Sequence, residues 1–176
     1  MAKQALPIVD MQQALFSNPR HDADGLMSRI DALAARLRSS QLPIIFIQHF
    51  GQEGDLLHPS QPGHALHAGL SVGPADMIVK KASCDAFLGT ELASTLSQLA
   101  VDELIVTGCA SDVCVDTTIR SALGHGYPPL APEDGHTTLD RPYLSVQDII
   151  KHHNNIWANF TSPVGPARST LCNAVS

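Results

Sequence analysis

Short apolar runs without polar alternation recur along this sequence, and they constrain its fold more than any other feature. They stand at residues 5–9, 42–49, 77–79 and 103–108. Strands that are apolar on both faces are typical of parallel sheets that helices cover on both sides. An amphipathic helical pattern at 25–40 separates the first two runs. The sequence therefore predicts a three-layer α/β/α fold with a central, mostly parallel sheet.

The second half of the chain continues this alternation less regularly. Leucines at helical spacing predict a helix around 92–99, and a second helix is expected to begin close to Cys114. A third helical pattern covers 144–157, with Ser145 as its N-cap. A fifth strand belongs at 126–134, but the prolines there favour an edge position or an irregular strand.

Composition narrows the class of protein. The chain has 176 residues, of which 44% are hydrophobic and 16% charged, so we expect one globular domain over residues 1–176. The net charge is −6 and the basic residues are scattered, which argues against a nucleic-acid partner. No apolar stretch is long enough to cross a bilayer, and no signal-peptide pattern stands at the N-terminus, so we expect no membrane partner. The four cysteines form no CxxC pair, which favours free thiols and a cytoplasmic location.

Polar residues directly follow several of the apolar runs. Asp10, His49 and Lys81 each follow one run, and the segment 108–114 follows another. Parallel sheets place their functional sites at the carboxyl ends of their strands, so these residues are expected to meet at one edge. The long segment 51–75, rich in Gly, Pro and His, is predicted to form a loop over that edge.

Cys114 is the candidate nucleophile. Either Ser111 or Asp112 would be the N-cap of a helix that holds Cys114 in its first turn. Free backbone N–H groups and the positive end of the helix dipole would there favour a thiolate and hold an oxyanion. A buried structural cysteine would give the same local pattern, so the surrounding residues leave both interpretations open.

Asp10 and Lys81 supply the charges that a cysteine nucleophile needs. A carboxylate at the end of a buried strand is costly without a partner or a task, although it could also cap a helix. Successive strand residues face opposite sides, so only one of Lys80 and Lys81 points into the site. Together with Cys114, these residues give a thiol, a base to remove its proton and a cation to favour the charged states.

Several histidines raise the question of a metal site. Five potential zinc or iron ligands stand close together in the sequence, namely His49, Asp55, His58, His64 and His67. Their spacing fits no helix or hairpin ligand pair, so we predict no metal and interpret them as polar loop residues plus one pocket histidine. His153 lies on an apolar helix stripe and is interpreted as a core residue. His136 follows the presumed fifth strand and either lies near the site or braces a turn.

Three motifs stand in order along the chain, namely VDMQ at 9–12, KASCDAFLGTEL at 81–92 and VTGCASDVCVDTT at 106–118. Together they resemble the isochorismatase-like cysteine hydrolases, a superfamily with a Rossmann-like fold that includes nicotinamidases and N-carbamoylsarcosine amidases. The resemblance implies a catalytic role for Asp10, Lys81 and Cys114, with Cys114 as the nucleophile.

The same resemblance implies further features of the site. A cis peptide bond before Ala110 would turn the N–H of Ala110 toward the oxyanion, alongside the N–H of Cys114. Gln12 and His49 would line the pocket. Members of the superfamily commonly form homo-oligomers, so a dimer or tetramer is expected.

Two departures from relatives guide the choice of reaction. Nicotinamidases carry an Asp-x-His metal motif after the second strand, whereas this chain reads IQHFG there. Isochorismate-cleaving members need not use the cysteine, and its retention favours an amide or related acyl substrate. We therefore hypothesise a cofactor-free hydrolase that acts on a small-molecule amide through a thioester at Cys114. Two alternatives stay open: a metal-dependent nicotinamidase-type amidase, and a non-catalytic binding or redox-sensing protein with a low-pKa Cys114.

Overall fold

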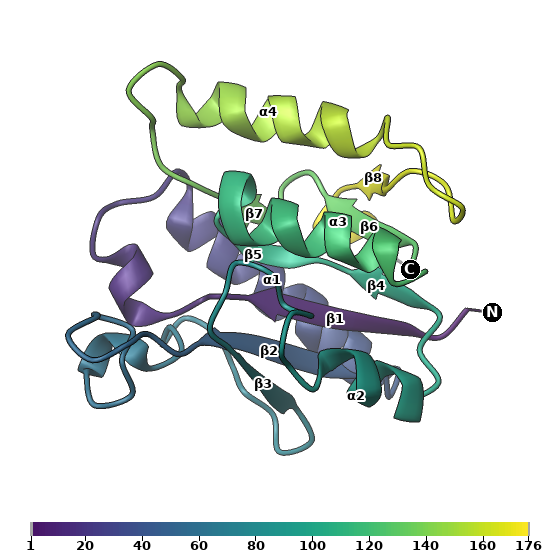
Figure 1. Ribbon diagram of the computed structural model, residues 1–176, viewed down its shortest axis with the longest axis horizontal. Coiled ribbons are helices and arrows are strands. Elements are labelled where there is room, and N and C mark those ends of the chain that lie inside the picture. Colours follow the sequence, from purple (N-terminus) through teal and green to yellow (C-terminus); the bar gives the residue numbers. More distant parts are fainter. Residues whose placement is uncertain (1, 176) are drawn as a thin grey trace.

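A parallel sheet forms the centre of the structure. The computed structural model describes residues 2–175, and its strand order is β3-β2-β1-β4-β6-β8, with β5 between β1 and β7 (Figure 1). The strands are β1 (Gln4–Val9), β2 (Ile44–His49), β3 (Met77–Lys81), β4 (Glu103–Ile105), β5 (Thr107–Cys109), β6 (Pro129–Pro132), β7 (His136–Thr137) and β8 (Arg168–Thr170). Each pairing between these strands is parallel.

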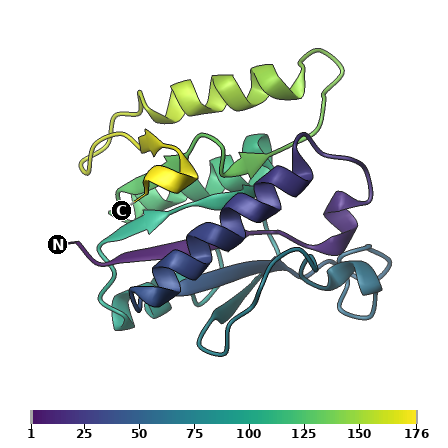
Figure 2. The same ribbon diagram turned by 180° about the vertical axis from the view of Figure 1, so that it is seen from behind.

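Helices cover both faces of the sheet, as Figures 1 and 2 show from opposite sides. One face carries α1 (Ala23–Ser39), and the other carries α2 (Leu92–Gln98) and α3 (Asp116–Gly124). α4 (Val146–Trp157) joins the α3 side, because Trp157 packs into the same apolar cluster as α2 and α3. Among the described helices, none is long and apolar enough to cross a membrane.

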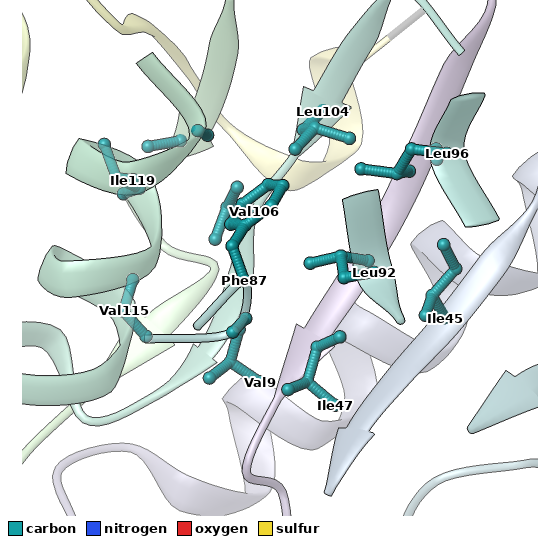
Figure 3. Packing of buried hydrophobic residues seen from close by; sticks show 14 of the residues in the cluster. Val9, Ile45, Ile47, Phe87, Leu92, Leu96, Leu104, Val106, Val115 and Ile119 are labelled. Atoms are coloured by element: carbon teal, nitrogen blue, oxygen red, sulfur yellow. The ribbon is translucent and has the colours of Figure 1, made fainter. Parts of the chain in front are cut away.

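The pleat of β2 divides its side chains between two apolar clusters. Ile45 and Ile47 point toward α2 and α3, whereas Ile44 and Phe46 point toward α1. Figure 3 shows Ile45 and Ile47 beside Leu92 of α2. Because side chains on both faces are buried, the strand reads as a continuous apolar run in the sequence. The predicted α/β/α fold with a mostly parallel sheet is confirmed.

Some predicted elements differ from the structure. The run at 103–108 forms two strands instead of one, because β4 pairs with β6 while β5 pairs with β7, and a turn separates these two partners. The edge position predicted for the proline-rich strand is wrong, since β8 pairs outside β6. The strand is nevertheless short, and Pro129 and Pro132 stand at its two ends, where a missing N–H disturbs the fewest sheet hydrogen bonds.

The predicted N-cap of α4 is present. The Ser145 side chain accepts a hydrogen bond from the N–H of Asp148 at 3.2 Å and lies 2.7 Å from the Asp148 carboxylate. This cap fixes the start of α4, and with it the position of Trp157 at the other end of the helix.

Gly108 in β5 is the residue where the sheet leaves no room for a side chain. Its φ is +124°, and a Cβ would lie 2.2 Å from the carbonyl oxygen of Val9. We expect Gly108→Ala to lower the free energy of unfolding by more than about 2 kcal/mol, because both backbones must shift. Urea denaturation measures this change.

Gly124, at the end of α3, provides the matched control. A Cβ there meets nothing within 4 Å. Gly124→Ala is expected to change the free energy of unfolding by less than about 1 kcal/mol, in the stabilising direction. Equal losses in the two variants would contradict the close approach of β5 and β1.

Candidate active site

Asp10 and Lys81 form a buried ion pair at the carboxyl edge of the sheet. Asp10 directly follows β1 and Lys81 ends β3, so the lysine reaches across β2 to its partner. Lys81 Nζ lies 2.7 Å from Asp10 Oδ2, and the two side chains are 0% and 3% exposed. Nζ also donates to the carbonyl of Ser83 at 2.7 Å. These contacts fix the ammonium and the carboxylate in one orientation.

The pleat of β3 decides which lysine enters the site. Lys81 is buried, whereas Lys80 is exposed and lies over the ring of Phe50 at 4.8 Å. The two neighbours therefore face opposite sides of the sheet, as the alternation of a strand requires.

Cys114 lies in a π-helical turn between β5 and α3. The turn covers Ser111–Val115, and its N-cap residue is Ala110. The expectation that Ser111 or Asp112 caps an α-helix around Cys114 is therefore wrong. Those two side chains bind elsewhere: Ser111 contacts His136, and Asp112 accepts hydrogen bonds from Thr138 and Arg141.

Cys114 and Asp10 each affect the pKa of the other. Burial raises the pKa of the Cys114 thiol, and the Asp10 carboxylate raises this pKa further. Burial also raises the pKa of the Asp10 carboxyl, while the Lys81 ammonium acts in the opposite direction. Burial and the neighbouring carboxylate both act against the thiolate that the helix dipole was expected to favour. Near neutral pH the thiol keeps its proton and needs a base to remove it.

Asp10 has one oxygen free to act as that base. Its Oδ2 binds Lys81, but Oδ1 is buried without a hydrogen-bond partner among residues 2–175. A buried oxygen in this state is costly unless a proton donor reaches it during function. The neighbouring Cys114 thiol and an incoming substrate or water are the donors that the site can offer.

A cavity of about 230 Å³ lies above these groups. Asp10, Cys114, His49 and Ala110 line it, so four of the six predicted site residues meet there. The peptide bond between Cys109 and Ala110 is cis. Burial, followed by the charge of Lys81, lowers the pKa of the His49 ring, so His49 is neutral at neutral pH.

Gln12 is not among the lining residues, which corrects the expectation that it lines the pocket. Its side chain is fully buried. Its Nε2 donates to the carbonyls of His49 and His64 at 3.0 and 2.9 Å, and its Oε1 accepts from the N–H of His49 at 2.8 Å. Gln12 therefore ties the end of β1 to the end of β2 and to the segment 51–75.

Six further residues line the cavity, namely Leu15, Arg20, Leu57, Cys109, Val113 and Arg141. Cys109 and Val113 lie in the segment 108–114, which was expected at this edge of the sheet. Leu57 belongs to the segment 51–75, whose predicted position over the site is confirmed at this point. Leu15, Arg20 and Arg141 carry no sequence signal that separates them from ordinary helix and loop residues.

His136 braces the turn that carries Cys114. Its Nδ1 lies 2.7 Å from Ser111 Oγ and its Nε2 lies 2.9 Å from Asn154 Oδ1. The Asn154 amide nitrogen donates to the carbonyl of Glu133, so Nε2–H donates to Oδ1 and Nδ1 accepts from Ser111. The buried ring packs edge-on against Trp157, with centroids 5.0 Å apart. Of the two predicted positions, bracing a turn is confirmed.

The loop histidines that were considered as metal ligands make local hydrogen bonds instead. His58 Nδ1 contacts Ser60, His64 Nδ1 contacts the carbonyl of Leu57, and His67 Nδ1 accepts from the N–H of Gly69. Within residues 2–175, no group of three or more His, Cys, Asp or Glu side chains could hold a metal ion. The residues present therefore do not fit the metal of nicotinamidases.

Comparison with known proteins assigns the family. The isochorismatase domain model matches residues 4–155. The chain belongs to the isochorismatase family. A streptothricin hydrolase from Streptomyces noursei is 36% identical over 141 residues, which are 79% of this chain and 56% of that protein. The chain thus spans about half the length of that hydrolase.

Two other isochorismatase-family proteins extend the comparison. An N-carbamoylsarcosine amidase from Arthrobacter sp is 35% identical over 65 residues, covering 36% of this chain and 25% of that protein. The crystal structure of an isochorismatase from Pseudomonas putida KT2440 matches with a TM-score of 0.91 and 27% identity, over 99% of this chain and 90% of that one. The structural match agrees with the fold described above.

The burial of His136 predicts a specific sensitivity to acid. Burial lowers the pKa of His136 to about 4, whereas an unfolded histidine titrates near 6.5. As pH falls from about 6.5 to about 4, the unfolded state takes up this proton first, so the free energy of unfolding falls by up to about 3 kcal/mol. Above about pH 6.5 this contribution to pH dependence vanishes.

Urea denaturation between pH 7 and pH 4 measures the effect. His136→Asn cannot titrate, so the difference in stability between the protein and this variant is expected to shrink as pH falls through that window. His152→Asn is the matched control, because His152 is exposed. Stability curves of the protein and His136→Asn that run parallel with pH would rule out a neutral buried imidazole.

Proposed function

We propose that this chain is a cysteine-nucleophile hydrolase that cleaves the C–N bond of a small amide through a thioester at Cys114. The observation that carries the proposal is the buried Lys81–Asp10 ion pair, with a free Asp10 oxygen beside the Cys114 thiol at the floor of a cavity. A thiol, a base and a fixed cation are the groups that acyl transfer to sulfur requires.

The first half of the reaction forms the thioester. Asp10 takes the thiol proton as Cys114 Sγ attacks the carbonyl carbon of the amide. The resulting oxyanion accepts hydrogen bonds from the N–H groups of Ala110 and Cys114. These hydrogen bonds are strongest when the negative charge develops on the oxygen. The C–N bond then breaks, Asp10 gives its proton to the leaving nitrogen, and ammonia or an amine departs.

The second half releases the acid. Asp10 removes a proton from water, the water oxygen attacks the thioester carbonyl, and the same N–H groups hold the second oxyanion. The C–S bond breaks and Sγ takes the proton back from Asp10, which restores the starting state. Lys81 takes no part in these proton transfers, and its charge favours the ionised form of Asp10.

The choice of an amide rests on two kinds of support. The family is one of hydrolases, and one relative in it is an N-carbamoylsarcosine amidase. The raised pKa of Cys114 also favours this reaction over redox sensing, since a sensor thiol needs a low pKa. For the nicotinamidase alternative, the test is metal analysis of the purified protein with nicotinamide as substrate. Stoichiometric zinc or iron together with nicotinamide turnover would favour that alternative.

We further propose that residues 1–176 form one domain. The partner of the protein is a small-molecule substrate. The protein is a homo-oligomer in the cytoplasm. Light scattering after gel filtration distinguishes a dimer or tetramer from a monomer.

Removal of the thiol is the primary test. We expect Cys114→Ala to lower kcat on a turned-over amide by more than about 1,000-fold, because no other group forms the acyl intermediate. The readout is ammonia release from a panel of small amides, carbamoyl compounds and esters. Cys172→Ala is the matched thiol control, since Cys172 is buried and does not line the cavity. A fully active Cys114→Ala variant would refute the mechanism, and an acyl adduct on Cys114 in the intact mass would support it.

Asp10→Asn separates the role of a base from that of a structural carboxylate. The Asp10 charge raises the pKa of Cys114, so its removal is expected to shift thiol alkylation to lower pH. Turnover is nevertheless expected to fall by more than about 100-fold, because the base is lost. Alkylation rate against pH and kcat, measured on the same variant, check both effects. A variant whose thiol becomes more reactive while turnover rises would contradict the assignment of Asp10 as the base.

A further inference from the structure

Arg20 brings an unpaired positive charge to the cavity above Cys114. Two arginines line this cavity, Arg20 and Arg141. Arg141 is neutralised by Asp112, with Nε 2.7 Å from Oδ2. Within residues 2–175, no carboxylate lies within 4.0 Å of the Arg20 guanidinium.

The other charges around the cavity cancel. Lys81 is paired with Asp10, and His49 is neutral because burial and Lys81 lower its pKa. The cavity therefore keeps one positive charge from Arg20, although the whole chain carries a net charge of −6. An isolated cation in an otherwise neutral cavity attracts an anion more strongly than it would in water.

The Arg20 guanidinium is already held in position. Its Nε donates to the carbonyl of Leu15, and its Cζ lies 5.6 Å from the centre of the Phe16 ring. Phe16 in turn packs edge-on against His67 of the segment 51–75, with ring centroids 5.1 Å apart. No described residue accepts a hydrogen bond from the terminal nitrogens of Arg20. A fixed guanidinium with two free N–H₂ groups matches the two oxygens of a carboxylate.

The remaining cavity walls are apolar. Leu15, Leu57 and Val113 contribute them, and the volume of about 230 Å³ is below that of a pocket for a drug-sized ligand. A substrate that fits is therefore short and apolar in its middle, with an amide at Cys114 and an acidic group at Arg20.

We propose that Arg20 determines specificity by binding a substrate carboxylate, so that the preferred substrates are small amides with a carboxylate at the end away from the scissile C–N bond. This inference deepens the proposed function and rests on it for the position of the amide.

Monoamides of short dicarboxylic acids test the inference against uncharged amides of equal length. Succinamic acid pairs with butyramide, and glutaramic acid pairs with valeramide. We expect kcat/KM to be higher for the acids, and Arg20→Met to lower kcat/KM by about 10- to 100-fold for the acids only. Arg20→Lys keeps the charge but not the fork, so part of the preference is expected to return.

A matched control and a charge reversal sharpen the result. Arg168→Met makes the same substitution on β8, at the far side of the sheet, and is expected to leave the acid preference unchanged. Arg20→Glu is expected to reverse the preference, toward amides that end in an ammonium group. Thermal denaturation of every variant checks folding, and Arg20→Gln replaces Arg20→Met if the latter does not fold.

A binding measurement separates this inference from the proposed function. Calorimetry with succinamate on Cys114→Ala, alone and combined with Arg20→Met, reports carboxylate binding without turnover. Binding that needs Arg20, with no hydrolysis of any amide by the unmodified protein, would overturn the proposed function but keep Arg20 as the carboxylate-binding residue. The inference is overturned if kcat/KM for the acids and for the uncharged amides of equal length differ by less than twofold, both in the protein and in Arg20→Met. Absence of both binding and hydrolysis would overturn both.

Discussion

The buried ion pair between Lys81 and Asp10 is the interaction on which the site depends. Removal of two charges from water is costly, and the mutual attraction of the pair offsets this cost only when the geometry is fixed. Three strands in the order β3-β2-β1 supply that geometry, since Lys81 and Asp10 stand at the ends of the outer two. The chemistry of Cys114 thus relies on the correct assembly of one side of the sheet.

A second set of contacts holds the nucleophile itself. The turn 111–115 is anchored from behind by the hydrogen bond between Ser111 and the buried His136, whose ring packs on Trp157. On its outer side, Asp112 is held by Thr138 and Arg141. Both anchors act through side chains two and three residues before Cys114, so the thiol is positioned without a partner of its own except Asp10. A fixed nucleophile loses little entropy when it attacks.

The sequence was informative about the fold and about the position of the site residues where a physical rule allows only one arrangement. Apolar runs with both faces buried predicted the parallel sheet, and the carboxyl-edge rule brought together Asp10, Lys81, His49 and Cys114. The sequence was misleading where several residues compete as hydrogen-bond partners for one side chain. Ser111 and Asp112 were predicted as caps, yet His136 and Arg141, distant in sequence, take their side chains. Gln12 was predicted to face the substrate, but three backbone groups at the end of β2 and in the loop bind its amide. Arg20 could not be found because nothing in a sequence shows that a charge lacks a partner.

The alternation of Lys80 and Lys81 sets different tolerances for insertion along the chain. Register in a strand has a period of two, so one residue added or removed within β3 would turn Lys81 outward and present Lys80 or a hydrophobic residue to Asp10. The same change in the exposed part of the loop 51–75 would cost only a small amount of chain entropy. The loop can therefore vary in length, and this changes the shape of the cavity mouth. The strand that ends in Lys81 cannot vary in length in this way.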